Sequence, residues 1–567
     1  MTKSNRRHAP SAATPRELPT WLTAVALAAA IWLVYRGSLS APWIFDDRLS
    51  VLSNPSIVAL WPLVGDTAAP GPLQPPVENP MSARPLVNLS FAANYHFGKF
   101  DPRGYRAVNI ALHFCNALLV YAIICRTLRL PHFDALPAHA ARWLATLAAL
   151  LWAVHPLATE AVVYVTQRTE LMVAFCYLAT LYASLRYWTA DSAAARRWWL
   201  AAAAGACLAG AGSKEVIVSA PLVVWLFDWT FVSRTARELW QKHWPLYAGL
   251  AASWIALSVL QIDSPRGKSA GFELGVPLAS WWYTQAEIFF LYLRLALWPA
   301  PLAIHYEWPQ LETFATAWIA VLAVLALATA ALWLVLRRRA AGWPLATVLA
   351  ILAPTHLVPI TTEIAAERRM YLPLAVIVAA VVVGGFETIG RRFPARDSNK
   401  SLTALATVAA VVAVVYGIAS AERVATFRDP VALWRQNVEL QPYNHVAQLS
   451  LASALSAAGV LQEALPHYQA AVDAQPDFVE GRYQLGLALG RAGKIDQAID
   501  ELQQVVASQP EAVKLRNNLG VMLFTAGRYP EAAAEFEKVL ELEPDFAEAR
   551  ENLNRALQAS VLPKKAE

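Results

Sequence analysis

Two adjacent carboxylates are the first residues of this chain that could do chemistry. Asp46 and Asp47 lie in the stretch Ala41-Pro-Trp-Ile-Phe-Asp-Asp-Arg48, directly after the first long apolar segment. Ionisable groups beside a bilayer are costly, so their presence suggests a function such as accepting a proton in general base catalysis. An acidic pair in a loop also fits a solvated surface or a helix cap, and both interpretations are open.

The segments around this pair are those of a membrane protein. Of the 567 residues, 57% are hydrophobic and 16% are charged, and the mean hydropathy is +0.36. This composition indicates a polytopic membrane protein. A spanning helix needs about 20 mainly apolar residues. Eleven stretches are predicted to span: 20–36, 107–125, 142–157, 170–187, 198–213, 216–232, 243–261, 313–336, 342–360, 371–389 and 402–421.

The distribution of Lys and Arg predicts the orientation, because these residues concentrate on the cytoplasmic side. Residues 1–19 are then cytoplasmic, and loop 37–106 and the chain after residue 421 lie on the opposite side. A further apolar stretch, 281–299, is predicted to lie at the membrane interface. The first apolar segment has no cleavage site of small residues, so we expect an anchor and not a removed signal peptide.

The last part of the chain has an internal repeat. Proline recurs every 34 residues, at Pro442, Pro476, Pro510 and Pro544. This is the period of tetratricopeptide repeats, whose stacked helix pairs present a concave face to a peptide or protein. The predicted domains are a cytoplasmic tail (1–19), a membrane domain (20–421), a linker with a degenerate leading repeat (422–444), three repeats with a capping helix (445–558) and a tail (559–567).

Several classes of function find no support in the sequence. The chain has no phosphate-binding loop, no dinucleotide-binding glycine motif and no HExxH metal motif. Its four cysteines show no paired metal-ligand spacing, and its basic residues form no single patch. We therefore predict no obligatory metal, no obligatory cofactor and no nucleic-acid partner.

A series of short stretches carries a resemblance to a known family. In chain order they are Phe45-Asp46-Asp47 with Asn54-Pro55, Arg84-Pro85-Leu86 with Asn94-Tyr95, Asn109-Ile-Ala-Leu-His113, His155-Pro156 with Thr159-Glu160, Arg168-Thr-Glu170, Lys214-Glu215, and Glu367-Arg368-Arg369-Met-Tyr-Leu-Pro373 before the repeats. Their order resembles the transmembrane and tetratricopeptide-repeat O-mannosyltransferases of the GT-C glycosyltransferase superfamily. Loop residues 65–80 have no counterpart in that pattern.

The resemblance implies an all-α fold, with a GT-C-like membrane core of about 11 spans followed by an α-solenoid. It also implies a polyprenyl-phosphate sugar as donor and a hydroxyl group as acceptor. On this basis we predict Asp47 as general base, with Asp46 as the substitute. The leaving phosphate needs cations, and the candidates are Arg84, Arg168, Lys214 and Arg368. His113, His155, Glu160 and Glu367 are further candidates for substrate binding.

These candidates also have structural interpretations. His113 shares a helix face with Asn109 and Asn116, which fits interhelical hydrogen bonding as well as a donor cavity. His155 beside Pro156 fits a capped turn. Lys214 fits a charge pair at a tight turn, and Arg368 fits an anchor at the lipid headgroups.

We therefore predict a glycosyltransferase in a bacterial inner membrane, with periplasmic repeats that bind the acceptor protein. It would transfer a single sugar, mannose in the resemblance, from a polyprenyl phosphate to a hydroxyl group of protein Ser or Thr. One alternative is en bloc transfer of an oligosaccharide. Another is a non-catalytic scaffold in which the repeats recruit envelope proteins.

Overall fold

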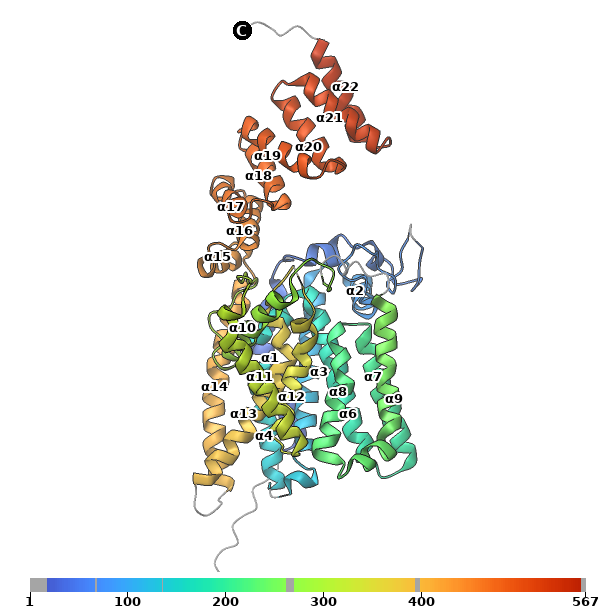
Figure 1. Ribbon diagram of the computed structural model, residues 1–567, viewed down its shortest axis with the longest axis vertical. Coiled ribbons are helices and arrows are strands. Elements are labelled where there is room, and N and C mark those ends of the chain that lie inside the picture. Colours follow the sequence, from blue (N-terminus) through green and yellow to red (C-terminus); the bar gives the residue numbers. More distant parts are fainter. Residues whose placement is uncertain are drawn as a thin grey trace, which may run out of the picture. The chain divides into compact units, whose positions relative to one another are not determined.

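Figure 1 shows the computed structural model of the chain, which describes residues 18–66, 69–134, 136–261, 270–360, 362–392 and 398–561. The predicted all-α class is confirmed. The described residues form helices and no named strand, and they include one isolated β-bridge between Ala270 and Ile360. The chain divides into two compact units, one of residues 1–302 and 308–428 and the other of residues 303–307 and 429–567.

The first unit is a bundle of mainly long, apolar helices. Its helices are α1 (Thr20–Tyr35), α2 (Pro85–Gly98), α3 (Pro102–Thr127), α4 (Ala138–Ala153), α5 (Thr159–Val163), α6 (Arg168–Trp188), α7 (Ala193–Ala211), α8 (Ala220–Phe227), α9 (Ala236–Gln261), α10 (Leu278–Leu297), α11 (Phe314–Leu336), α12 (Gly342–Leu357), α13 (Tyr371–Arg392) and α14 (Ser398–Thr426). The long helices run along a common direction in Figure 1. Helix α6 packs against α3 and α7, and α13 packs against α4, α12 and α14.

Every stretch predicted to span is at least partly helical, but the helices differ in length and polarity. By length and composition alone, six helical segments of the described residues could cross a membrane, or seven if the bent pair α4 and α5 is one span. That pair bends by 58° beside Pro156. The four other predicted spans are α6, α7 and α9, which carry more charged or polar residues, and α12, which is a shorter apolar helix. The count of eleven therefore stays a prediction.

Helix α11 illustrates the membrane character of this unit. It has no charged residue, and its large side chains point outward: Ile319 is 67% exposed, Leu325 56% and Leu332 59%. Such a surface is unfavourable in water and suits contact with lipid. The first unit is therefore a membrane-protein bundle.

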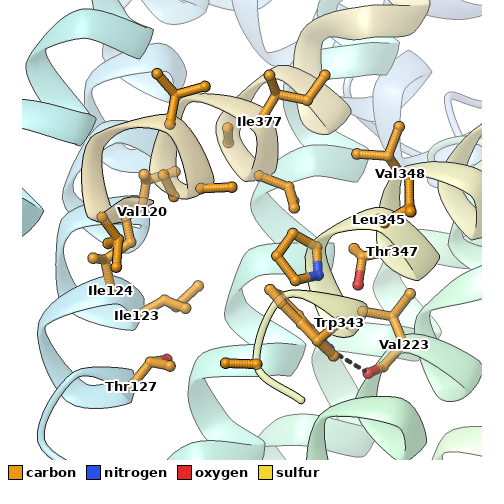
Figure 2. Close-up of a pocket in the computed structure, with 18 of the residues that line it drawn as sticks. Val120, Ile123, Ile124, Thr127, Val223, Trp343, Leu345, Thr347, Val348 and Ile377 are labelled. Carbon is orange, nitrogen blue, oxygen red and sulfur yellow. Dashed lines mark hydrogen bonds between the residues drawn. The ribbon is translucent and has the colours of Figure 1, made fainter. Parts of the chain in front are cut away.

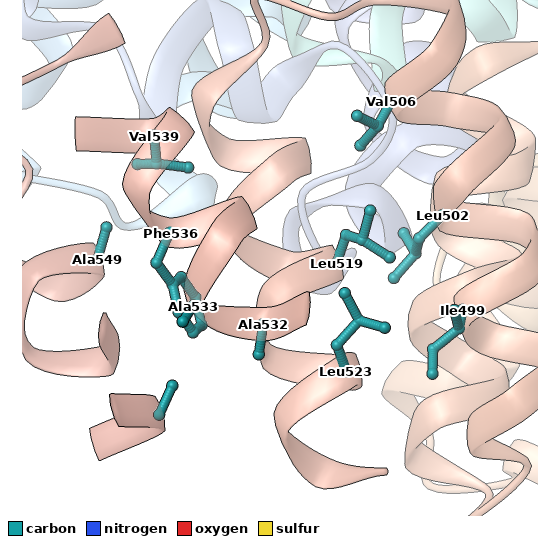
Figure 3. Packing of buried hydrophobic residues seen from close by; sticks show 11 residues of the cluster. Ile499, Leu502, Val506, Leu519, Leu523, Ala532, Ala533, Phe536, Val539 and Ala549 are labelled. Carbon is teal, nitrogen blue, oxygen red and sulfur yellow. The ribbon is translucent and has the colours of Figure 1, made fainter. Parts of the chain in front are cut away.

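The second unit is the repeat array. Its helices are α15 (Pro430–Leu440), α16 (His445–Ala457), α17 (Leu461–Ala474), α18 (Val479–Arg491), α19 (Ile495–Ser508), α20 (Val513–Thr525), α21 (Tyr529–Leu542) and α22 (Ala547–Val561). The first helix of each repeat ends at a glycine with positive φ, which a side chain would disfavour: Gly459 (82°), Gly493 (79°) and Gly527 (75°). Figure 3 shows part of the core, where Leu502, Leu519 and Phe536 are buried.

A short segment from elsewhere in the chain completes the start of the array. Residues 303–307 are held by side-chain amides of α15 and of the turn after it. Asn437 accepts a hydrogen bond from His305 N (3.1 Å) and donates one to His305 O (3.0 Å). Gln441 makes the same pair of bonds with Glu307 N and Glu307 O, both at 3.0 Å. The segment therefore belongs to the repeat unit by contact, although the sequence predicts it to lie in the membrane domain.

Candidate functional site

The acidic pair lies on a turn between α1 and the short helix Arg48–Leu52. Phe45 has a positive φ of 43°, which is uncommon for a bulky residue. Hydrogen bonds from Asp47 N to Ile44 O (2.9 Å) and from Ser50 N to Asp46 O (2.9 Å) close the turn. This backbone sends the two neighbouring carboxylates into different surroundings.

Asp47 is fully buried, and its carboxylate serves local structure. Its Oδ1 accepts hydrogen bonds from Thr166 N (2.8 Å) and Thr166 Oγ1 (2.7 Å), and its Oδ2 accepts one from Ile44 N (3.2 Å). Burial raises the pKa of Asp47 to about 6, although the Thr166 bonds and Arg106 oppose the rise. Because both carboxylate oxygens are engaged, Asp47 is poorly disposed to accept a proton from a substrate.

Asp46 is partly exposed, and charged side chains surround it. Its backbone N–H donates to Tyr164 Oη at 2.8 Å. Burial raises the pKa of the Asp46 carboxyl, whereas Arg368, a hydrogen bond from Tyr164, and Arg84 oppose this rise. Asp46 is therefore the more accessible carboxylate of the pair.

Arg84 lies near Asp46, at the residue before α2, and is 7% exposed. Arg84 NH2 lies 4.0 Å from Glu215 Oε2, and Arg84 Nε has no hydrogen-bond partner among the described residues. Burial lowers the pKa of Arg84 to about 10, while Glu170 opposes this effect. A buried guanidinium with an unused donor suits an incoming anion.

Lys214 supplies a second cation, on the turn after α7. Its ammonium pairs with the Glu170 carboxylate at the start of α6. Burial lowers the pKa of Lys214 to about 8; Glu170 opposes this shift, and the neighbouring Arg84 and Arg368 add to it. An anion between these cations would reduce their mutual repulsion.

Arg368 is the third cation, and two carboxylates orient it. Its NH1 donates to Glu160 Oε1 at 2.6 Å, its backbone N–H donates to Glu160 Oε2 at 3.1 Å, and its NH2 pairs with Glu363. Electrostatic interactions link it to Asp46, Arg84 and Lys214. We call Asp46, Arg84, Glu160, Lys214 and Arg368 the charged cluster.

His113 lies outside the charged cluster, inside the helix bundle. Its Nδ1 is 2.7 Å from Tyr371 Oη, and its Nε2 is 3.0 Å from Ala153 O. Asn116, on the same face of α3, donates to Leu171 O at 3.0 Å. These contacts are the interhelical hydrogen bonds of the structural interpretation, and a role of His113 in substrate binding stays a prediction.

His155, Arg168 and Glu367 also have contacts that stabilise the fold. His155 Nδ1 accepts a hydrogen bond from Leu157 N at 3.2 Å and so caps a short turn. Arg168 donates to Asn109 Oδ1 (2.8 Å) and to carbonyl groups of the neighbouring segments. Glu367 is buried, 4.0 Å from Arg423 NH2. Their roles as site residues stay predictions.

Three residues that hold the acidic turn belong to no recognised sequence motif. Tyr164 and Thr166 contact Asp46 and Asp47 from a segment more than a hundred residues away. Arg106, which is fully buried, donates to Val163 O at 3.1 Å and to backbone carbonyls at the start of the acidic turn. These residues match no motif, and only the buried arginine of α3 stands out as an unusual charge in an apolar segment.

An apolar cavity of about 470 Å³ lies inside the bundle. It is lined by α3, α6, α8, α12 and α13, and Figure 2 shows Val120, Ile124, Val223, Trp343 and Ile377 around it. Leu372, which follows Arg368 by four residues, also lines it. Its lining suits a hydrocarbon chain better than a polar molecule.

Within the described residues, no group of three or more His, Cys, Asp or Glu side chains could hold a metal ion. Independence from metal stays a prediction. The positive charges of the charged cluster come from its arginine and lysine side chains.

Comparison with known proteins gives a consistent result. A family model described as tetratricopeptide repeat matches residues 483–545. Protein O-mannosyl-transferase Tmtc2 of Drosophila melanogaster is 33% identical over 212 residues, which cover 35% of this chain and 20% of that protein. Tmtc1 of Drosophila melanogaster is 34% identical (26% and 16% covered), and TMTC4 of Homo sapiens is 33% identical (30% and 23%).

The matches thus span about a fifth of the length of these relatives. A crystal structure of the MamA protein is 22% identical and covers 23% of this chain and 71% of its own, with a TM-score of 0.22. That score is too low to support an argument about function. In its repeats, its apolar helices and the stretches matched above, the chain is similar to the TMTC proteins, which are named protein O-mannosyl-transferases.

Proposed function

We infer that this chain is a membrane glycosyltransferase that transfers one sugar, mannose, from a polyprenyl phosphate to a hydroxyl group of a protein. The observation that carries this inference is the charged cluster, in which the partly exposed Asp46 interacts with Arg84 and Arg368, and Lys214 interacts with the same two arginines. The relatives named above are protein O-mannosyl-transferases, which supports the transfer of a sugar to protein.

The proposed reaction is a direct displacement that needs one carboxylate, which acts as general base. The acceptor oxygen attacks C1 of the sugar, and the bond between C1 and the phosphate oxygen breaks. Its electron pair leaves with the polyprenyl phosphate, and the hydroxyl proton passes to the Asp46 carboxylate. Attack from the face opposite the leaving group inverts the configuration at C1.

Asp46 is our choice of base, although sequence reasoning favours Asp47. A general base must reach the proton that it removes. Asp46 is partly exposed, whereas Asp47 is fully buried and both of its oxygens accept hydrogen bonds. Asp47 then serves to fix the turn that presents Asp46.

Arg84, Lys214 and Arg368 would bind the donor phosphate. Arg84 has an unused Nε–H donor, and Lys214 loses repulsion when an anion arrives. Arg368 is oriented by Glu160, so that its charge is held near Asp46. Charge stabilisation by preorganised cations is the main aid that a phosphate leaving group needs.

The apolar cavity would take part of the polyprenyl chain. Its lining is almost entirely aliphatic and aromatic, and Leu372 connects its wall to the helix that begins next to Arg368. The repeats would bind the acceptor protein, as such arrays commonly bind peptides. We assign the protein to a bacterial inner membrane, with the charged cluster and the repeats on the periplasmic side.

The test compares a deletion strain carrying wild type, Asp46→Asn or Asp47→Asn at matched expression. Intact-mass and glycopeptide spectrometry of envelope proteins should show hexose-sized additions with wild type. Asp46→Asn should abolish them, and Asp47→Asn should retain part of them if the protein remains folded. Larger additions would favour en bloc transfer, and identical spectra in all strains would favour the scaffold.

A further inference from the structure

The side chain of Tyr164 contacts Asp46, the proposed base. Tyr164 follows α5, and its side chain is 1% exposed. Its Oη accepts a hydrogen bond from Asp46 N at 2.8 Å. The same residue opposes the rise in the pKa of the Asp46 carboxyl group that burial causes. Tyr164 therefore anchors the backbone of Asp46 and favours the charged form of its side chain.

The hydroxyl of Tyr164 stays protonated, so it presents a hydrogen-bond donor and not a negative charge to Asp46. Burial raises the pKa of Tyr164 well above its usual value, and the neighbouring Asp46 and Asp47 raise it further. The phenol therefore remains protonated at any working pH. A buried tyrosine hydroxyl also needs a hydrogen-bond partner, and the Asp46 N–H supplies one.

Two residues further on, Thr166 holds Asp47 in a similar way, by donating from its backbone N–H and its hydroxyl. The segment 164–166 therefore holds both acidic residues, Asp46 through its backbone and Asp47 through its carboxylate. The difference lies in exposure: Asp47 is buried, and Asp46 is partly open.

We propose that Tyr164 is a positioning residue for the transfer reaction, which holds the backbone of Asp46 so that the carboxylate of this residue faces the acceptor hydroxyl. The inference rests on the proposed function, with Asp46 as base. Without the phenol, desolvation and the neighbouring Glu363 would favour the protonated acid, and only Arg368 and Arg84 would oppose them.

The experiment measures sugar transfer by the full-length protein as a function of pH, with polyprenyl-phosphate mannose as donor and a Ser/Thr-containing peptide as acceptor. In Tyr164→Phe, the acidic limb of kcat/KM should move to higher pH. Activity below the limb should fall about 10-fold for each pH unit of that move. The donor KM should stay the same, because the phosphate-binding cations are unchanged.

Tyr187→Phe is the matched control. Tyr187 is a buried tyrosine near the other end of α6, and its hydroxyl contacts Lys242 O and Arg196. This variant should leave the acidic limb in place. If the limb moves equally in both variants, general loosening of the fold explains the shift and the proposal fails.

A second variant covers the case in which Tyr164→Phe does not fold. A fluorinated tyrosine at position 164 keeps the hydroxyl but lowers the pKa of the phenol, which makes it a stronger donor. The acidic limb should then move to lower pH. If the wild type is active and the acidic limb of kcat/KM does not move in the proteins substituted at position 164, the role of Tyr164 is overturned and the proposed function stands. A wild type that transfers no sugar at any pH would overturn the proposed function itself.

Discussion

At the scale of single residues, Asp46 and Asp47 differ because of the turn that carries them. The positive φ of Phe45 costs of the order of 1 to 3 kcal/mol and persists only where neighbouring contacts hold it. Here Thr166 and Tyr164 supply those contacts. The turn therefore buries the Asp47 carboxylate and leaves the neighbouring Asp46 carboxylate accessible.

The raised pKa of Asp47 predicts a pH dependence of stability. A carboxyl whose pKa is higher in the folded protein stabilises the fold below its unfolded value of about 3.9, and this contribution is lost as the pH rises through about 6. The loss corresponds to about 3 kcal/mol. Asp47→Asn should therefore flatten the dependence of Tm on pH between 4 and 7, measured by thermal unfolding in detergent.

The exposed Asp191 is the control for that measurement. Asp191→Asn should keep the wild-type slope of Tm against pH. An unchanged slope in Asp47→Asn would show that this buried carboxyl titrates as it does in the unfolded chain.

Lys214 predicts a pH dependence of donor binding. Its pKa is about 8, so its charge, and with it part of the attraction for the donor phosphate, is lost as the pH rises through that value. The donor KM should rise by up to about 10-fold between pH 7 and 9. Lys214→Arg should keep a constant KM, because guanidinium stays charged. A wild-type KM that is equal at both pH values would contradict this role.

Part of the candidate site could be predicted from the sequence. Asp46, Arg84, Lys214 and Arg368 were recognisable as unusual charges at the ends of apolar segments. Tyr164 was not, because its contact with the acidic turn joins segments 118 residues apart and follows no helical or strand period. The sequence also did not show which of Asp46 and Asp47 is accessible, since this depends on the backbone turn at Phe45.

At the scale of helices, the apolar cavity gives a test of donor binding. Ala379 on α13 lines the cavity. Ala379→Phe would fill part of it, so the donor KM should rise several-fold while the acidic limb of kcat/KM stays in place. The measurement is sugar transfer at increasing donor concentration. Ala326→Phe, at an exposed position of α11, should leave the donor KM unchanged.

The clamp on residues 303–307 gives a test within the repeat unit. Asn437→Ala removes three hydrogen bonds to backbone groups of the segment, and each buried group left unpaired costs about 1 to 3 kcal/mol. Hydrogen exchange, followed by mass spectrometry of the full-length protein, should become faster in this segment and in α15. Asn554→Ala, at an exposed position of α22, should leave that exchange unchanged. Equal exchange in both variants would mean that the amide contacts do not hold the segment.

Most helices were predictable because their cause is local. A long apolar run forms a helix in lipid whatever surrounds it, and the 34-residue period fixes the repeats. The docking of residues 303–307 was not predictable. It depends on contacts with distant residues, such as the hydrogen bonds between Asn437 and His305.

At the scale of the whole molecule, the predicted orientation can be tested by labelling. Single cysteines at the exposed positions Asp66, Arg337 and Glu551 would be made in a chain whose native cysteines are replaced. With an odd number of spans, an impermeant maleimide should label positions 66 and 551 in spheroplasts. Position 337 should react only after permeabilisation. If position 337 is labelled in spheroplasts and position 551 is not, the orientation of the protein is the reverse of the predicted one.

The place of residues 303–307 in the repeat unit has a consequence for exchange of parts between related proteins. An array excised after Arg428 would leave behind five residues that complete its first helix. A chimera that receives only the C-terminal portion of a relative would therefore pair foreign amides with a native segment that they were not selected to hold. The repeats and residues 303–307 form one structural unit that is encoded in two separate parts of the gene. A functional exchange therefore has to transfer both parts.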